Sequence, residues 1–133
     1  MRTSLDTSIS CVNTMAQYAA VEALSGPQDS VKQMINEFRI RRDLLVEGIE
    51  KIKGLKCVKP NGAFYLYVNI SETGLSSEEF AMRLLREARV ALVPGTAFGP
   101  GGTEYVRISY VTSQKNLLEG IKRISNFVES LNL

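Results

Sequence analysis

The stretch Asn61-Gly62-Ala63-Phe64-Tyr65-Leu66-Tyr67-Val68-Asn69-Ile70 decides the fold of this chain. Its side chains alternate from residue 63 onward. One face carries Phe64, Leu66, Val68 and Ile70, and the other carries Tyr65, Tyr67 and Asn69. A period of two predicts a strand with one buried face. The preceding Pro60-Asn61-Gly62 predicts the turn that leads into it.

Three more strands are expected around this one. They cover Leu55–Val58, a buried run at Val90–Val93 that Pro94 stops, and Tyr105–Val111. Between the last two, residues 94–102 predict a loop rich in glycine and proline.

Two helices are expected before the first strand, after an irregular arm over residues 1–12. The first begins near Thr14 with a capping box to Gln17, and a left-handed Gly26 followed by Pro27 ends it. The second covers residues 28–53, where apolar side chains recur every three, four or seven positions. Helices of this length often bridge two bodies.

Two more helices follow the strand at residues 63–70. Ser76 and Glu79 form a capping box that opens a helix ending near residue 88. The residues expected to face inward on it are Phe80, Ala81, Leu84, Leu85 and Ala88. The last helix, over residues 113–131, carries an apolar face of Leu117, Ile121, Ile124, Val128 and Leu131.

The resulting order is α-α-β-β-α-β-β-α. Hairpins and helices that join such strands predict an α+β fold, a two-layer sandwich whose antiparallel or mixed sheet has helices on one side.

Composition bounds the function. The chain has 133 residues, 44% of them hydrophobic and 23% charged, which predicts one folded globular domain. A net charge of +2 gives no argument for nucleic acid or an anionic membrane as a partner. Histidine is absent, which excludes Ser-His-Asp and Cys-His triads and histidine-bound zinc within this chain.

Cysteine usage and the N-terminus indicate a soluble, cytoplasmic protein. Cys11 and Cys57 form no CxxC motif, and two reduced thiols are favoured over a disulfide. The first residues lack the apolar core of a signal peptide, and no apolar run approaches the roughly 20 residues that span a bilayer.

Arg107 is the candidate for chemistry. Alternation in its strand places it with Tyr105 and Ser109, opposite Val106 and Ile108. A mid-strand guanidinium needs a partner, and its planar fork matches a carboxylate. From spacing alone, a structural ion pair with an acidic residue of this chain, or a place on an exposed sheet face, is favoured over a ligand site.

Two other segments suggest weaker hypotheses. The loop over residues 94–102 could cradle a phosphate, but it contains neither GxxxxGK[ST] nor GxGxxG, which favours a structural crossover. The aromatic strand after Gly62 could stack RNA bases, but Ala63 stands where an RNP1 motif needs an aromatic residue.

Taken together, the motifs resemble the C-terminal part of class I pyridoxal-phosphate aminotransferases of the aspartate aminotransferase group. The resemblance runs over nearly the whole chain, in five segments of matching order. They are Thr14–Leu24, Phe38-x-x-Arg41-Arg42-Asp43, Pro60-x-Gly62-Ala63-Phe64-Tyr65, Val93-Pro94-Gly95-x-x-Phe98-Gly99 and Val106-Arg107-Ile108-Ser109.

The resemblance implies which domain each part of the chain belongs to and which residues bind substrate. Residues 1–26 would come from the end of the large domain, and residues 27–133 would form the small domain. Arg107 would grip the substrate α-carboxylate, with Gly62 and Phe64 nearby as further substrate-binding residues. The parent enzyme, a homodimer, would move an amino group between an amino acid and a 2-oxo acid, using pyridoxal 5'-phosphate.

The same resemblance predicts what this chain lacks. None of its seven lysines stands in the sequence context of the lysine that holds the cofactor in this family. We therefore expect no catalytic residue, no metal site and no bound cofactor in this fragment, which would be inactive alone. Two alternatives stay open: a stand-alone amino-acid-binding or regulatory module, and an interaction domain in which Arg107 is purely structural.

Overall fold

The computed structural model describes residues 11–131. The chain divides into two compact units, residues 1–34 and residues 35–133, with the division inside one long helix. The predicted arm at residues 1–12 falls almost entirely outside the described residues.

In the first unit, helix α2 covers Thr14–Ser25. It begins where the sequence predicted, but the capping box is wrong. The helix cap is Asn13, whose side-chain oxygen accepts a hydrogen bond from the Met15 amide at 2.8 Å. Gln17 instead donates to the carbonyl of Val12 at 2.8 Å. Asparagine outranks threonine as a helix cap, which explains the shift by one residue.

The end of α2 also differs from the prediction. Gly26 is extended (φ −76°, ψ −177°) and not left-handed, and its amide donates to the carbonyl of Glu22 at 2.8 Å. The reason is Pro27, because a proline ring pushes the residue before it toward extended backbone.

Helix α3 covers Asp29–Glu50, and its residues from 35 onward belong to the second unit. The strands of this unit are β1 (Lys56–Cys57), β2 (Tyr65–Asn69), β3 (Val93–Pro94) and β4 (Tyr105–Ser109). Its other helices are α4 (Ser77–Arg83), continued as a π-helix over Leu84–Ala88, and α5 (Gln114–Ser130). The short 3₁₀ helices are Ser71–Thr73, Gly95–Phe98 and Pro100–Gly102.

The four strands form one sheet in the order β1-β2-β4-β3, with every neighbouring pair antiparallel. The α+β class and the predicted element order are therefore confirmed. In the central pair, Leu66 lies opposite Ile108, Tyr67 opposite Arg107 and Val68 opposite Val106.

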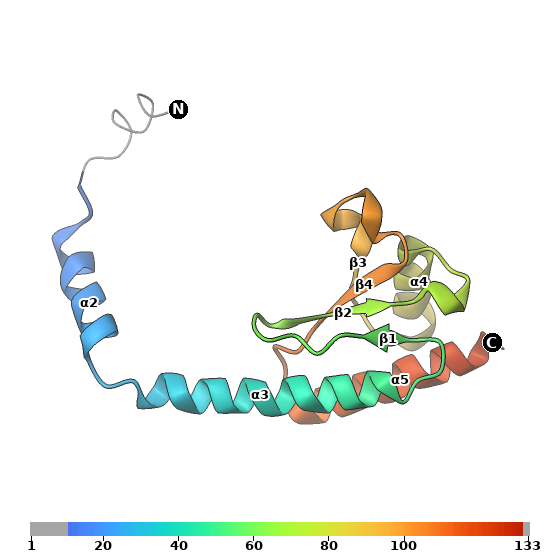
Figure 1. The fold of residues 1–133 in the computed structure, drawn as a ribbon, viewed down its shortest axis with the longest axis horizontal. Helices are drawn as coiled ribbons and strands as arrows, with labels where there is room; N and C mark the ends of the chain where they lie inside the picture. Colours follow the sequence, from blue (N-terminus) through green and yellow to red (C-terminus); the bar gives the residue numbers. More distant parts are fainter. Residues whose placement is uncertain (1–10, 132–133) are drawn as a thin grey trace. The chain divides into compact units, whose positions relative to one another are not determined.

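One face of the sheet is covered and the other is open. Figure 1 shows the second half of α3 and α5 running along the same side of the strands. Leu66, Val68 and Val106 point into this layer and are almost completely buried. The helices supply most of the remaining core, with Leu45, Val46 and Ile49 from α3, Phe80 and Leu84 from the α4 segment, and Leu117, Ile124, Phe127 and Val128 from α5.

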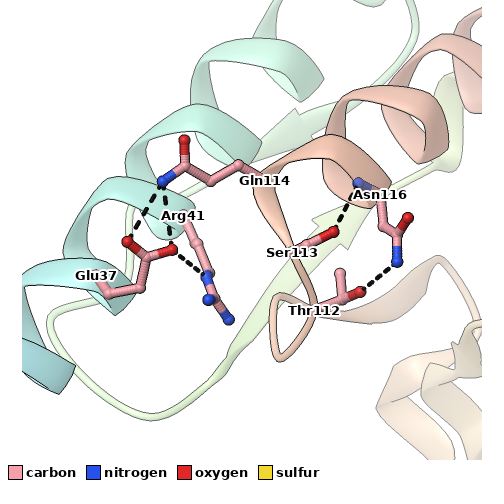
Figure 2. A network of polar contacts seen from close by, with 6 residues as sticks. All are labelled: Glu37, Arg41, Thr112, Ser113, Gln114 and Asn116. Atoms are coloured by element: carbon pink, nitrogen blue, oxygen red, sulfur yellow. Dashed lines mark hydrogen bonds and ion pairs between the residues drawn. The ribbon is translucent and has the colours of Figure 1, made fainter.

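Glu37 ties α3 to the start of α5 (Figure 2). Its carboxylate accepts a hydrogen bond from Arg41 at 2.8 Å and from the Gln114 side-chain amide at 3.3 Å. The Arg41 bond is the main cause that holds the Glu37 pKa below its ordinary value. Ser113 caps α5 by accepting from the Asn116 amide at 3.2 Å. The segment that leaves β4 is thus held against α3.

Two expectations within this unit are wrong. The predicted strand at Val90–Val93 shortens to Val93–Pro94, with Pro94 inside it. Proline is tolerated there because β3 is an edge strand that pairs only with β4. Leu85, predicted to face inward, is 43% exposed. It lies in the π-helix, whose extra residue per turn rotates the side chains away from the α-helical period.

The glycine-rich loop folds back on itself through close backbone contacts. A Cβ on Gly102 would overlap the carbonyl group of Gly95, and a Cβ on Gly95 would stand 2.6 Å from the Tyr67 hydroxyl. Gly99 has φ +135°, a conformation that other residues rarely adopt. Glycine is therefore required at these three positions.

We predict that Gly102→Ala destabilises the fold by about 1–3 kcal/mol, the usual cost of overpacking, because the new methyl group collides with backbone. Urea unfolding of the 133-residue chain measures the change. Gly101→Ala is the matched control, since no atom lies within 4 Å of a Cβ there. Equal stability of the two variants would contradict the packing assigned to this loop.

Candidate functional site

Arg107 lies in the middle of β4, on the open face of the sheet. Its neighbours across the sheet are Tyr67 in β2 and Val93 in β3. The side chain is half-buried, while Val106 beside it is 1% exposed. The alternation predicted for this strand is confirmed, and it directs the guanidinium away from the core.

Two aromatic rings hold this guanidinium. Its central carbon lies 4.1 Å from the centroid of the Tyr65 ring and 4.6 Å from that of Phe98. Stacking on an aromatic face attracts the cation electrostatically and leaves the edge of its planar fork for hydrogen bonding. Tyr65 comes from β2 and Phe98 from the glycine-rich loop, so three segments meet at Arg107.

Further aromatic rings extend this surface. Tyr67 stacks on Tyr105 with centroids 5.0 Å apart and meets the edge of Phe98 at 6.5 Å. Each of these tyrosines comes from the outward-facing positions of β2 or β4. The result is an aromatic surface around one cation, which we call the Arg107 cradle: Arg107, Tyr65, Tyr67, Phe98 and Tyr105.

Within residues 11–131, the side chain of Arg107 makes no ion pair and no hydrogen bond. The ion pairs found there use other cations, among them Arg41, Arg42 and Arg83. Of the two interpretations favoured from spacing, the structural ion pair is therefore not found within residues 11–131, and the place on an exposed sheet face agrees with the half-buried side chain. The five N–H donors of the Arg107 guanidinium stay available to a carboxylate that is not part of the described chain.

The sequence singled out neither the Phe98 ring nor the Tyr65 ring as a contact of the Arg107 guanidinium. Tyr65 was assigned to the outer face of its strand, but the register that sets it diagonal to Arg107 depends on which strands pair. Phe98 comes from a loop whose path is set by the contact between Gly95 and Gly102, which no local pattern reveals.

The two other predicted site residues lie away from the cradle's rings. Gly62 is exposed in the loop before β2, with open space where a side chain would be. Phe64 precedes β2, and its ring packs on Phe38 of α3 with centroids 4.7 Å apart. Phe64 thus faces the helix layer as predicted, although 43% of it stays exposed. The structure does not bring its ring to Arg107.

Ala63, between these two residues, has a left-handed backbone with φ +63°. This conformation costs a residue with a side chain about 1–2 kcal/mol. Tyr110, the residue after Ser109, opposes that cost. Its hydroxyl donates to the Ala63 carbonyl at 2.8 Å, and its amide donates to the Phe64 carbonyl at 3.1 Å.

Charged side chains of α3 hold the loop before β2 at its other end, near Pro60. Asp43 accepts hydrogen bonds from Arg42 at 2.7 Å and pairs with Lys59 at 2.9 Å. Arg42 also donates to the Pro60 carbonyl at 3.3 Å. The bonds from Arg42 and Lys59 lower the pKa of Asp43 to about 2.

Other site chemistries find little support in the described residues. No group of three or more His, Cys, Asp or Glu side chains within residues 11–131 could hold a metal ion. No helix in this part of the chain is long and apolar enough to cross a membrane. Cys11 and Cys57 are both free thiols.

Comparison with known proteins gives the family. The sequence profile of the family described as "Aminotransferase class I and II" matches residues 4–124. The chain belongs to this family. It is 48% identical over 121 residues to an aspartate aminotransferase of Bacillus sp. (strain YM-2), a match that covers 87% of this chain and 30% of the relative. An aspartate aminotransferase of Pyrococcus horikoshii is 44% identical over 120 residues, covering 89% of this chain and 31% of the relative.

Solved aminotransferase structures share the fold. The aspartate aminotransferase of Rhizobium meliloti superposes with a TM-score of 0.85 at 37% identity, over 96% of this chain and 34% of the other. The aromatic aminotransferase of Pyrococcus horikoshii gives 0.82 at 42% identity, over 87% and 31%. The chain therefore spans about a third of the length of the aminotransferases it matches.

We predict that the Asp43 cluster loses its contribution to stability in acid. Because folding lowers the pKa of Asp43 from an ordinary value of 3.8 to about 2, the contribution is complete above pH 4 and disappears as the pH falls toward 2. Thermal unfolding between pH 2 and pH 6 measures it. Asp43→Asn should lower stability at pH 6 and flatten the acid limb of the profile. A variant profile parallel to the parent's would contradict this assignment.

Proposed function

We propose that this chain is the substrate-clamping C-terminal small domain of an aminotransferase. The complete enzyme would move an amino group between an amino acid and a 2-oxo acid. The observation that carries the proposal is Arg107, whose guanidinium is held by two aromatic rings while no described carboxylate neutralises it.

Arg107 suits a substrate that always carries a carboxylate. The planar fork can donate two parallel hydrogen bonds to the two oxygens of that group. Amino acids and 2-oxo acids share the carboxylate, so one arginine serves both directions of the reaction. Tyr65 and Phe98 restrict the guanidinium before substrate arrives, which reduces the conformational freedom lost on binding. We propose Gly62 and Phe64 as further residues on the substrate side.

We propose that no lysine of this chain attaches pyridoxal phosphate covalently. All seven are exposed, and Lys56 and Lys59 are paired with Glu72 and Asp43. The cofactor would supply the electron sink for the chemistry. We propose that the remaining two thirds of the enzyme bind it, and that this chain contributes substrate binding alone.

The exposed apolar surface of helix α2 supports the proposal that the complete enzyme has a larger domain. It has no buried residue, and its large apolar side chains are widely exposed: Met15, Tyr18, Val21 and Leu24. Exposed large apolar side chains along a helix are typical of one that packs against further protein. We propose that residues 1–26 belong to the large domain and residues 27–133 to the small domain. The complete enzyme would be a cytoplasmic homodimer.

The central prediction concerns Arg107 in a complete enzyme. Joining this chain to the preceding two thirds of the Bacillus sp. aspartate aminotransferase gives a chimera that can be assayed with L-aspartate and 2-oxoglutarate. Arg107→Ala should lower its kcat/KM by about 3–5 kcal/mol of activation free energy, because a charge-paired contact is lost. At 1.36 kcal/mol per tenfold change, that is roughly two to four orders of magnitude.

Arg86→Ala is the matched control, since Arg86 is an exposed arginine on the helical segment at residues 84–88. It should leave kcat/KM within a factor of two. An unchanged kcat/KM in Arg107→Ala would remove Arg107 from the substrate site and overturn the proposal.

A second prediction concerns the 133-residue chain alone. With pyridoxal phosphate, L-aspartate and 2-oxoglutarate it should show no transamination, and α2 amides should exchange with solvent within seconds. In the chimera, the same amides should become protected at least 100-fold.

Lysine-dependent cofactor absorbance in the isolated chain, or tight calorimetric binding of amino acids to it, would favour a stand-alone binding module instead.

A further inference from the structure

The loop over residues 60–64 is fixed at both ends and open in the middle. Pro60 and Ala63 each give their carbonyl to a side chain from another element. Gly62 lies between these anchors, exposed, and no atom stands within 4 Å of the place where its Cβ would be. The loop is therefore held in place while its centre keeps room for another molecule.

Tyr110 holds one end of this loop from a position in the core. Only 2% of the residue is exposed, and its ring lies 6.3 Å from that of Phe38. From this packed position its hydroxyl reaches the carbonyl of Ala63, whose positive φ persists only where the surroundings enforce it. A phenylalanine would fill the core equally well but would not make this bond.

Arg42 and Asp43 perform the same task from α3. Asp43 orients Arg42 and Lys59, and Arg42 then reaches the Pro60 carbonyl. The side chain of Arg42 is only 18% exposed, so the guanidinium has little freedom to leave this position. The loop is thus anchored on two elements that are themselves part of the core.

We propose that Tyr110 and Arg42 are positioning residues that hold the Pro60–Phe64 loop in one conformation, so that Gly62 meets the substrate in a fixed place. That Gly62 faces the substrate rests on the proposed function. The anchoring of the loop does not, and it can be tested separately.

The first test measures loop order in the 133-residue chain. Backbone ¹⁵N relaxation should give Gly62 and Ala63 order parameters near 0.85 in the parent, and below about 0.6 in Tyr110→Phe. The matched control is Thr73→Val, which removes another buried hydroxyl bonded to a backbone carbonyl, that of Ile70 at 2.7 Å. Thr73→Val should leave Gly62 and Ala63 ordered. A rigid loop in Tyr110→Phe would overturn the proposal.

The second test separates binding from turnover in the chimera. Tyr110→Phe and Arg42→Gln should each raise KM for L-aspartate about tenfold and change kcat less than threefold, because the loop must be ordered again at each binding event. Arg123→Gln, which breaks the Arg123–Glu119 pair on α5, is the matched control and should change neither. A mobile loop with unchanged KM would overturn the positioning role.

The experiments distinguish failure of the loop-anchoring proposal from failure of the proposed function. If Arg107→Ala loses activity and Tyr110→Phe keeps both KM and a rigid loop, this inference fails and the proposed function stands. If Arg107→Ala keeps full activity, the proposed function fails, and the relaxation measurement still decides whether Tyr110 anchors the loop.

Discussion

The antiparallel pairing of β2 with β4 is the constraint on which this structure depends. One register sets Val68 opposite Val106 on the covered face and Tyr67 opposite Arg107 on the open face. Because strand side chains alternate, a slip by one residue would exchange the two faces. Leu66, Val68 and Val106 would lose burial worth about 1.5–3 kcal/mol each, and Arg107 would enter the apolar layer.

This arrangement explains why an unpaired cation can stay on the sheet. Arg107 stands on rigid strand backbone and is contacted by rings from β2 and from the glycine-rich loop. The side chain is only half-buried, so the guanidinium avoids the full desolvation cost of a buried charge. A carboxylate ligand can then replace water at the edge of the fork, which agrees with membership of an aminotransferase family.

Local patterns predicted most elements because each has a strong local cause. The alternation at residues 63–70 and the cap at Ser76 needed no knowledge of the rest of the chain. The errors arose where a neighbour overrode a local preference. Pro27 forced Gly26 into extended backbone, an edge position admitted Pro94 into β3, and a π-helix turned Leu85 outward.

In the candidate site too, local sequence patterns predicted the position of a residue but not its contacts. Arg107 was identified from its place in a strand, but the ion pair that was one of its two expected settings does not occur within residues 11–131. Its contacts with Tyr65 and Phe98 came only from the fold. Phe64, expected near the substrate, has its ring on the Phe38 side.

By itself, the sequence determined the α+β class, the order of elements, the outward position of Arg107 and the resemblance to aminotransferases. These depend on residue type and spacing along the chain, which local physical chemistry can interpret. Only the tertiary structure decided which rings hold Arg107, that no described carboxylate neutralises it, and how Tyr110 and Arg42 anchor the loop around Gly62. The two bonds that anchor the loop join residues 18 and 47 positions apart, and such separations close only when the strands and helices have packed.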